Sequence, residues 1–554
     1  MRWRRMRTAF VWLVIAGAAA AAPTPKNAVA SAHPLATAAG MQMLREGGNA
    51  FDAAVAVSAV LAVVEPASSG VGGGGFYLLH SAKGNRDVMV DAREAAPLAA
   101  RADMYVAPDR APGTSSTDGP LAAGIPGEPA AWAHLARQYG RLPLSKSLAP
   151  AIQIARDGFP LYARLQNAIR VKQARLAASP DAARVFLDNG QVPAVGALIR
   201  QPDLAATLEL LARKGVDAFY RGEWADRLVD GIRRDGGIWT REDLARYRVV
   251  ERKPLTLHYR DATLVTAAPP SSGGVVIGEV LNMLSEYDFS HLDRDTRRHL
   301  TLEALRRAFR DRAEYLGDPD FVQMPLQRLL SADYAAGMAT SIRLDRATPS
   351  DMLRPVAEES EGPHTTHFSV LDAQGNRVAA TISVNLFFGA TYVVPGTGFL
   401  LNDTMDDFSI EAGKPNAFQL VGAAANAVGP AKRALSSMTP TFVESPKGLL
   451  IIGSPGGSTI ISNVLFGILG WFDGMSAAQI VAMPRVHHQY LPDLVTLEPG
   501  ALSADERAAL ERRGHHVSEG RNTWGNTQVI TWDYQTGEVV TASDPRGFGA
   551  GLVY

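Results

Sequence analysis

The sequence contains no cysteine, which excludes disulfides, thiolate metal sites and a cysteine nucleophile. It also lacks net charge, because 55 basic and 56 acidic side chains leave a formal charge of −1. Without a basic excess, the chain has no electrostatic footprint for nucleic acid. After the first two dozen residues no apolar run is long enough to predict a membrane span. These absences leave a globular chain of 554 residues whose function must lie in particular side chains.

The N-terminus has the pattern of an export signal. Arg2, Arg4, Arg5 and Arg7 form a basic start, and an apolar run follows from residue 9 to residue 21. That run is too short to span a bilayer comfortably, and the alanines at 19–22 are small enough for a signal peptidase. We therefore expect residues 1–22 to be a signal peptide and the mature protein to be periplasmic or secreted. A retained membrane anchor is the alternative, because Pro23 crowds the cleavage site.

Most of the N-terminal part has a helical pattern. Residues 34–64 predict helix with a cap or turn at 49–52, and residues 204–213 and 297–315 predict further helices between residues 142 and 346. A glycine run at 70–75 precedes a predicted strand at 76–79. No Lys-Ser/Thr follows these glycines, so they do not form a P-loop.

The texture changes in the last third of the chain. Residues 348–363 are polar, acidic and rich in proline, which predicts an exposed, mobile linker. Strands are predicted directly afterwards, at 367–371, 377–384, 449–452, 527–532 and 539–542. The linker therefore runs straight into a strand that begins with threonine.

The sequence at this boundary resembles that of a known enzyme family. Thr365-Thr366-His367-Phe368-Ser369-Val370 resembles the start of the small subunit of γ-glutamyltransferases, and the similarity continues through motifs in the family's order. These motifs are Gly47 to Ala54, Asp91 to Glu94, Gly124 to Gly127, Met405 to Ser409, Leu435 to Thr441, Gly453 to Ser458 and Ser543 to Arg546. The resemblance implies an N-terminal-nucleophile hydrolase that cuts itself between His364 and Thr365. It also implies a mixed α/β (α+β) fold: a four-layer αββα sandwich shared by a large subunit (23–364) and a small subunit (365–554).

The expected nucleophile is Thr365. A threonine hydroxyl attacks poorly at neutral pH, but the α-amine released by cleavage, with a pKa of about 7.7–8.0, is a suitable base. The resemblance makes Ser383 the hydroxyl beside the nucleophile, where the family usually has a second threonine. It makes the backbone amides of Gly456 and Gly457 the oxyanion hole. Taken alone, Thr365 would be an ordinary strand residue and the glycines an ordinary turn.

A γ-glutamyl donor ends in a zwitterion, so its pocket needs one cation and one anion. Arg93 can grip the carboxylate with two hydrogen bonds, and Asp407 can hold the ammonium. The resemblance adds Ser436 and Ser437, which complete the carboxylate and ammonium contacts, and Asn385 at the amino end. Alone, charged residues such as these are mostly surface groups.

Besides Ser383, two further positions depart from the family. Thr404 stands where a Gln or Glu usually contacts the donor ammonium, which shortens the reach of that side chain. Phe418 lies in a segment resembling the lid loop over the pocket, where some bacterial members have a tyrosine that hydrogen-bonds across the opening. A phenylalanine can cover the pocket but cannot form that hydrogen bond.

We therefore expect a γ-glutamyltransferase and hydrolase whose donors are glutathione or γ-glutamyl compounds and whose acceptors are amino acids, peptides or water. The two fragments are expected to form a heterodimer, with no metal and no organic cofactor, since the adjacent histidines at 487–488 and 515–516 point to opposite faces. One rival is a glutaryl or cephalosporin acylase of the same fold. Another is an amino-acid-binding protein that never cleaves itself, which a denaturing gel would show as one band.

Overall fold

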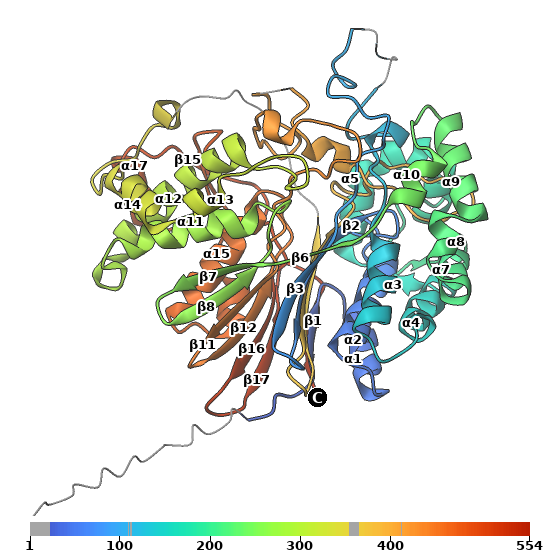
Figure 1. Cartoon of the computed structure of the whole chain (residues 1–554), viewed down its shortest axis with the longest axis horizontal. Coiled ribbons are helices and arrows are strands. Elements are labelled where there is room, and N and C mark those ends of the chain that lie inside the picture. The colour runs from blue at the N-terminus through green and yellow to red at the C-terminus, as the bar shows by residue number, and fades with distance from the viewer. Residues whose placement is uncertain (1–22, 109, 111–113, 354–364, 412) are drawn as a thin grey trace, which may run out of the picture.

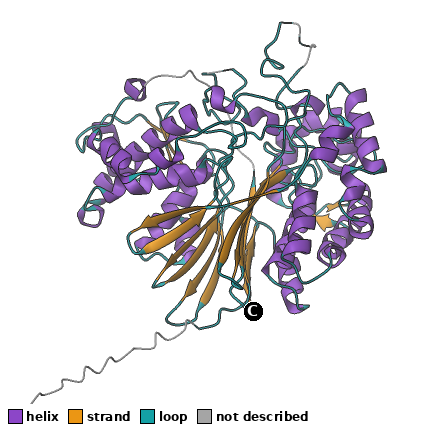
Figure 2. Ribbon diagram, viewed as in Figure 1, coloured by secondary structure: helices purple, strands orange, loops and turns teal. Residues whose placement is uncertain are grey.

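Two antiparallel β-sheets lie face to face at the centre of the molecule, between two layers of helices (Figures 1 and 2). The computed structural model describes residues 23–108, 110, 114–353, 365–411 and 413–554. The predicted signal peptide at 1–22 and His364 lie outside these residues. The arrangement is the αββα sandwich expected from the resemblance.

Strands that precede residue 365 and strands that follow it are interleaved in the first sheet. Its order is β18 (Ala550–Val553), β1 (Ala28–Ser31), β9 (Thr366–Leu371), β10 (Arg377–Ser383), β2 (Gly74–Ser81), β3 (Arg86–Ala92) and β6 (Val250–Arg252). The second sheet runs β17 (Val539–Ser543), β16 (Gln528–Asp533), β12 (Gly448–Gly453), β11 (Thr441–Ser445), β8 (Ala262–Thr266) and β7 (Leu255–Tyr259). Strands β9 and β10 pack across the interface against β12.

The first helical layer covers the outer face of the first sheet, on the right in Figure 1. It contains α1 (Pro34–Arg45), α2 (Ala50–Val64), α3 (Glu128–Gln138), α4 (Leu144–Asp157), α5 (Ala163–Ala178), α6 (Pro180–Phe186), α7 (Pro202–Lys214), α8 (Asp217–Tyr220), α9 (Glu223–Arg234) and α10 (Arg241–Arg246). Helix α2 packs directly on β9 and β10. Every residue of α2 is buried, as its apolar sequence requires.

The second helical layer lies on the left in Figure 1 and covers the second sheet. It contains α11 (Gly273–Ser285), α12 (Arg294–Tyr315), α13 (Leu326–Leu329), α14 (Ala332–Thr340), α15 (Thr459–Phe472), α16 (Ala477–Ala482) and α17 (Ala504–Arg512). Smaller sheets pair β4 (Phe159–Pro160) with β5 (Leu198–Ile199), and β14 (Val495–Leu497) with β13 (Val486–His487) and β15 (Val517–Glu519). No helix in the described part of the chain has both the length and the apolar character needed to cross a membrane.

The predicted elements are confirmed wherever the local pattern was strong. The turn predicted at 49–52 is a capping box at the start of α2: the Asn49 side chain accepts from the Asp52 backbone N–H, and the Asp52 carboxylate accepts from the Asn49 backbone N–H. The predicted helices at 204–213 and 297–315 are α7 and α12, and the predicted strands after residue 365 are β9, β10, β12, β16 and β17.

Two regions differ from the sequence-based expectation. Strands β7 and β8 lie between residues 142 and 346, where the sequence analysis named helices and no strand. Residues 354–363 of the predicted linker lie outside the described residues; at its start Pro349, Asp351 and Met352 are exposed, but Ser350 between them is buried and its hydroxyl donates to the Tyr490 carbonyl oxygen over 2.7 Å. Its backbone N–H donates to the Asp493 carboxylate over 2.8 Å. Polar composition indicated an exposed segment, and Ser350 is the residue that departs from it, because its polar groups have protein partners.

Candidate active site

Thr365 lies at the start of β9, where strand pairing brings it opposite the end of β10. The antiparallel register pairs Thr366 with Ile382, so the next residues outward, Thr365 and Ser383, face each other. Their hydroxyl oxygens are 3.2 Å apart, and both residues are buried. The sheet therefore places a second hydroxyl beside the predicted nucleophile.

Asn385 connects this hydroxyl pair to the segment that carries Asp407. Its backbone N–H donates to the Ser383 Oγ over 2.8 Å, and its side-chain Nδ2 donates to the Asp403 carbonyl oxygen over 3.1 Å. Its φ of +80° lies in the left-handed region, which is uncommon for a residue other than glycine. The backbone thus turns sharply out of β10, and the turn holds Ser383 in place.

A glycine turn joins β12 to α15. Gly456 and Gly457 have φ values of +141° and +53°, which favour glycine. A Cβ on Gly456 would lie 2.4 Å from the Thr459 Oγ1, whose hydroxyl donates to the Gly456 carbonyl oxygen over 2.7 Å. Within the described residues, neither glycine N–H donates to another protein group. Two unused amides at a helix start suit a developing oxyanion.

The charged end of the site is formed by a buried ion pair. Arg93, directly after β3, pairs with Asp407 in the 3₁₀ helix Thr404–Asp407, and it also pairs with Glu94 at 3.4 Å. Burial raises the pKa of the Asp407 carboxyl group, and the positive charge of Arg93 opposes that rise. A cation and an anion therefore lie side by side, as recognition of a zwitterion requires.

Ser436 and Ser437 are held by the start of α11. The backbone N–H and the hydroxyl of Ser272 each donate to the Ser436 carbonyl oxygen, both over 2.7 Å. The Ser436 N–H donates to the Pro270 carbonyl oxygen over 2.8 Å. The Ser437 Oγ accepts a hydrogen bond from Arg312 over 3.4 Å. Residues far apart in the sequence thus orient the serine pair.

One cavity collects most of the predicted residues. It is lined by Thr365, Ser383, Asn385, Arg93, Asp407, Ser436, Ser437 and Gly457. Gly456 and Thr404 are not among its lining residues. The cavity brings together the Thr365 hydroxyl, the glycine turn and the Arg93–Asp407 ion pair. These groups suit acyl transfer from a donor with a zwitterionic end.

Thr404 lies behind this cavity rather than on its wall. It is buried, and its side chain is beside the Glu94 carboxyl group. Burial raises the pKa of Glu94, and the positive charge of Arg93 partly offsets that rise. The position where a longer side chain was expected to reach the donor is therefore next to a buried acid.

Sequence reasoning missed Arg312, which lines the cavity from α12. Helix α12 carries several arginines, and its mixed charges look like an ordinary solvated face in the sequence. Glu94 stood inside a recognised motif but was assigned no role. The spacing of apolar residues along α12 was the local signal that could have indicated a buried arginine. It does not show which arginine of the helix lines the cavity.

Phe418 covers the cavity together with Leu420, in the segment expected to be a lid loop. The side-chain Nε2 of Gln489 donates to the carbonyl oxygens of Phe418 and Gln419, over 3.2 and 3.0 Å. The loop is therefore held through its backbone by a glutamine, although its phenylalanine has no hydroxyl.

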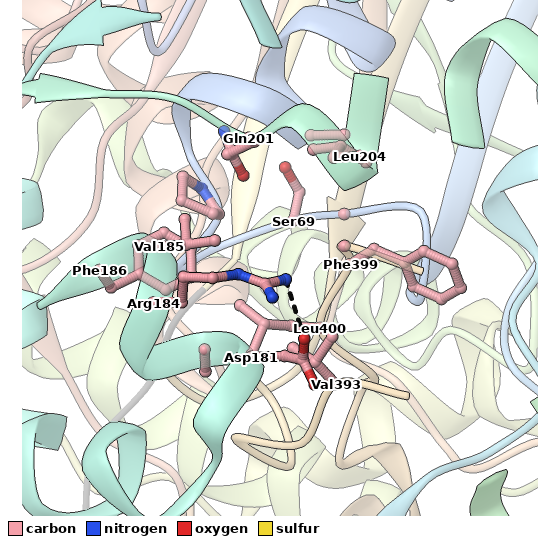
Figure 3. A pocket seen from close by; sticks show the side chains of 15 residues that line it. Ser69, Asp181, Arg184, Val185, Phe186, Gln201, Leu204, Val393, Phe399 and Leu400 are labelled. Atoms are coloured by element: carbon pink, nitrogen blue, oxygen red, sulfur yellow. Dashed lines mark hydrogen bonds and ion pairs between the residues drawn. The ribbon is translucent and has the colours of Figure 1, made fainter. Parts of the chain in front are cut away.

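A second pocket lies away from these residues. Its wall includes Ser69, Gln201 and Arg184, and Figure 3 shows Arg184 paired with Asp181. The Gln201 amide donates to the Val63 carbonyl oxygen over 2.8 Å. This pocket contains none of the predicted catalytic or donor-binding residues.

Comparison with known proteins finds relatives of this chain in sequence and in structure. The sequence profile of the family "Gamma-glutamyltranspeptidase" matches residues 36–554. The chain is 42% identical over 492 residues to the glutathione hydrolase proenzyme of Pseudomonas sp. (strain A14), covering 88% of this chain and 85% of the relative. It is 41% identical over 525 residues to the glutathione hydrolase proenzyme of Escherichia coli (strain K12), covering 94% and 90%. Among solved structures, the cephalosporin acylase from Bacillus halodurans superimposes with a TM-score of 0.83 at 28% identity, covering 99% of each chain.

Proposed function

The chain belongs to the γ-glutamyltranspeptidase family of enzymes, and from that premise we propose that it cleaves itself before Thr365 and then transfers γ-glutamyl groups to amino acids, peptides or water. The observation that carries the proposal is the cavity in which Thr365, the glycine turn and the Arg93–Asp407 pair meet. Glutathione is the donor that the names of the relatives suggest.

Self-cleavage requires one nucleophile and one water molecule. The Thr365 hydroxyl oxygen attacks the carbonyl carbon of His364, the bond from that carbon to the Thr365 nitrogen breaks, and an ester forms. Water then hydrolyses the ester, which leaves a carboxylate on His364 and a free α-amine on Thr365. The Ser383 hydroxyl, 3.2 Å from the Thr365 hydroxyl, can accept or donate a proton at that oxygen.

The same hydroxyl then carries the γ-glutamyl group. The freed amine accepts the hydroxyl proton while the oxygen attacks the γ-carbonyl carbon of the donor. The N–H groups of Gly456 and Gly457 stabilise the negative charge that develops on the carbonyl oxygen, and losing one such donor typically costs about 10²–10³ in rate. The donor amide bond breaks, its nitrogen leaves with a proton, and an acceptor amine or water resolves the ester.

Donor recognition follows from the charged end of the cavity. Arg93 and the serine pair would hold the α-carboxylate, while Asp407 and Asn385 would hold the ammonium. Arg93 and Asp407 are already paired in the cavity, so both charges are in position before a donor arrives. A zwitterion binds there with one charge against each partner.

The proposal extends to processing and export. Residues 1–22 would direct export and be removed, residues 23–364 would form the large fragment, and residues 365–554 the small fragment. Strands of the two fragments are interleaved in the first sheet, where β9 from the small fragment pairs with β1 from the large fragment. This pairing supports a stable heterodimer. The names of the relatives, which include the word proenzyme, support processing.

N-terminal sequencing of both fragments tests this proposal together with p-nitroanilide assays on the same sample. We expect the smaller fragment to begin at Thr365, the larger to begin near residue 23, and γ-glutamyl anilide to be hydrolysed. A single uncleaved chain that binds glutamate without turnover would contradict the enzymatic function.

Glutaryl transfer is the second candidate activity, because the acylase superimposes over the whole chain and Thr404 is short. A glutaryl group lacks the α-ammonium that Asp407 would hold. A kcat/KM higher for glutaryl anilide than for γ-glutamyl anilide would favour the acylase. We expect the reverse, since Asp407 and Asn385 both line the cavity.

A further inference from the structure

The cavity contains a second buried arginine, and its surroundings differ from those of the first. Arg93 is paired with two carboxylates, those of Asp407 and Glu94. Arg312 is 5% exposed, and within the described residues its guanidinium has hydroxyl partners instead. Its Nε donates to the Ser272 Oγ over 2.9 Å, and a terminal nitrogen donates to the Ser437 Oγ over 3.4 Å.

A buried cation with only neutral partners is costly, because hydroxyls replace lost hydration poorly. Burial lowers the pKa of Arg312 to about 10, and the charge of Asp407 opposes this change. Within the described residues, Asp407 is committed to Arg93 through a direct ion pair. The unliganded cavity therefore has a positive charge at Arg312 that an arriving carboxylate would neutralise.

The direction of the hydrogen bonds shows how that charge reaches a ligand. A guanidinium has donors only, so the Ser437 oxygen must accept from Arg312. The Ser437 hydroxyl proton thus remains available for a ligand in the cavity. A hydroxyl that accepts a bond from a cation is a stronger donor in turn.

Ser272 completes the arrangement on the other side. Its hydroxyl accepts from the Arg312 Nε and donates to the Ser436 carbonyl oxygen over 2.7 Å. Arg312 and Ser272 precede Thr365 in the chain, whereas Ser436 and Ser437 follow it. The residues before the cleavage point therefore orient the serine pair after it.

We propose that Arg312 is a positioning residue for the donor α-carboxylate: it holds Ser436 and Ser437 in place and supplies the positive charge that this carboxylate neutralises. The inference rests on the proposed function, because it assumes a γ-glutamyl donor in this cavity. Arg93 keeps Asp407 oriented toward the ammonium, and the two arginines together balance the charges of the cavity and the bound zwitterion.

Arg312→Met, which keeps the length of the side chain and removes its charge, tests the proposal. The donors are γ-glutamyl p-nitroanilide and the same anilide with its α-carboxylate methylated. We expect self-cleavage to persist, KM for the free acid to rise at least about tenfold with little change in kcat, and the preference for acid over ester to fall by a similar factor. Arg312→Lys should recover part of this preference, because it restores the charge without the fork of donors.

Arg310→Met is the matched control, since Arg310 is on the same helix and pairs with Asp311. It should leave KM and the acid-to-ester preference unchanged. If Arg312→Met lowers turnover of acid and ester equally, its role is structural and the proposal is wrong. If Arg312→Met does not cleave itself, Ser272→Ala decides: a higher KM for the acid supports the proposal, and an unchanged KM overturns it. Failure of the unaltered protein to hydrolyse γ-glutamyl anilide would instead contradict the proposed function.

Discussion

In the proposed mechanism Thr365 combines two roles in one hydroxyl group, which makes it the most informative single residue to change. We predict that Thr365→Ala yields one uncleaved chain without turnover, because the hydroxyl is needed first to break the backbone and then to carry the acyl group. A denaturing gel and the γ-glutamyl anilide assay measure both effects.

Thr366→Val is the control for this change, because the buried Thr366 hydroxyl has no hydrogen-bond partner in the described chain. Valine keeps the β-branched shape that suits β9. This variant should cleave itself and turn over the donor. Two bands from Thr365→Ala would show that another residue performs the cleavage.

A substitution at Thr404 distinguishes the two candidate activities, γ-glutamyl transfer and glutaryl transfer. We predict that Thr404→Gln raises the ratio of kcat/KM for γ-glutamyl anilide over glutaryl anilide by roughly tenfold or more, because a hydrogen bond to a charged group contributes about 1.5–3 kcal/mol. The longer amide would extend from beside Glu94 toward the donor ammonium.

Thr404→Val, which has the same shape and no hydroxyl, should leave that ratio unchanged. If Thr404→Gln does not raise it, the side chain at 404 does not face the donor's amino end. An unaltered protein that already prefers glutaryl anilide would support the acylase.

Individual residues were predictable where a family motif surrounded them. Thr365, Arg93 and the serine pair all line the cavity, as expected. Arg312 was not predictable, because its partners Ser272 and Ser437 are distant in the sequence. Its importance depends on burial and on the absence of a carboxylate partner among the described residues, and neither property is local.

At the scale of single elements, the start of α3 carries a buried acid. The Oε1 of Glu128 accepts hydrogen bonds from the hydroxyls of Ser58 and Tyr77 and, over 2.9 Å, from the Trp132 indole N–H. Its Oε2 is buried without a partner within the described residues. Burial raises the pKa of Glu128 from 4.5 to about 7, and the three hydrogen bonds oppose that rise.

This raised pKa makes stability depend on pH. The folded state holds the Glu128 proton more tightly than the unfolded state, so its contribution is fully present below about pH 4.5 and is lost as pH rises through 7. The full change is roughly 3 kcal/mol. We predict that Glu128→Gln, which needs no proton, raises the melting temperature relative to the parent at pH 8.5 by about 2 °C more than at pH 5.5, because about 2 kcal/mol of the change falls between these two pH values.

Thermal unfolding at a fixed scan rate measures this difference. Glu223→Gln is the control, because Glu223 is also in the first turn of a helix, α9, but is exposed. Its melting temperature relative to the parent should not change with pH in this range. An equal difference at both pH values for Glu128→Gln would show that Glu128 is already ionised in the folded protein.

Local patterns predicted elements with strong periodicity better than elements that depend on partners. Helix α2 follows from a capping box and a continuous apolar sequence. Strands β7 and β8 are short, and β8 is paired on its other side by β11, which lies far along the chain. In the described chain β7 pairs only with β8, across a turn at Arg260 and Asp261, so this hairpin is local and was overlooked; the sequence near residue 260 lacks only the pairing of β8 with β11.

At the scale of the whole molecule, strands before and after the proposed cleavage point interleave in the first sheet. Strand β1 pairs with β9 on one side and with β18 on the other, and β2 pairs with β10. We predict that the cleaved fragments co-elute on size exclusion in buffer and separate only in concentrated denaturant, because separation would break both sheets. Fragment 365–554 expressed alone should not fold.

Uncleaved Thr365→Ala protein provides the reference elution volume, which the cleaved protein should match. Fragments that separate in buffer would contradict the shared-sheet account. Folding of the small fragment by itself would do the same, since β9 and β10 lack their outer neighbours without the large fragment.

The sequence by itself predicted Thr365 as the nucleophile, and it also predicted the glycine turn, the strands after residue 365 and the residue types suited to a zwitterion, because each prediction depends on neighbours along the chain. Only the tertiary structure decided how the sheets interleave, which arginine of α12 meets the cavity and that Thr404 lies behind it. These properties arise from pairing and burial between residues hundreds of positions apart, such as Arg93 with Asp407. Local periodicity reports which face of an element is apolar, but it does not report which distant element covers that face.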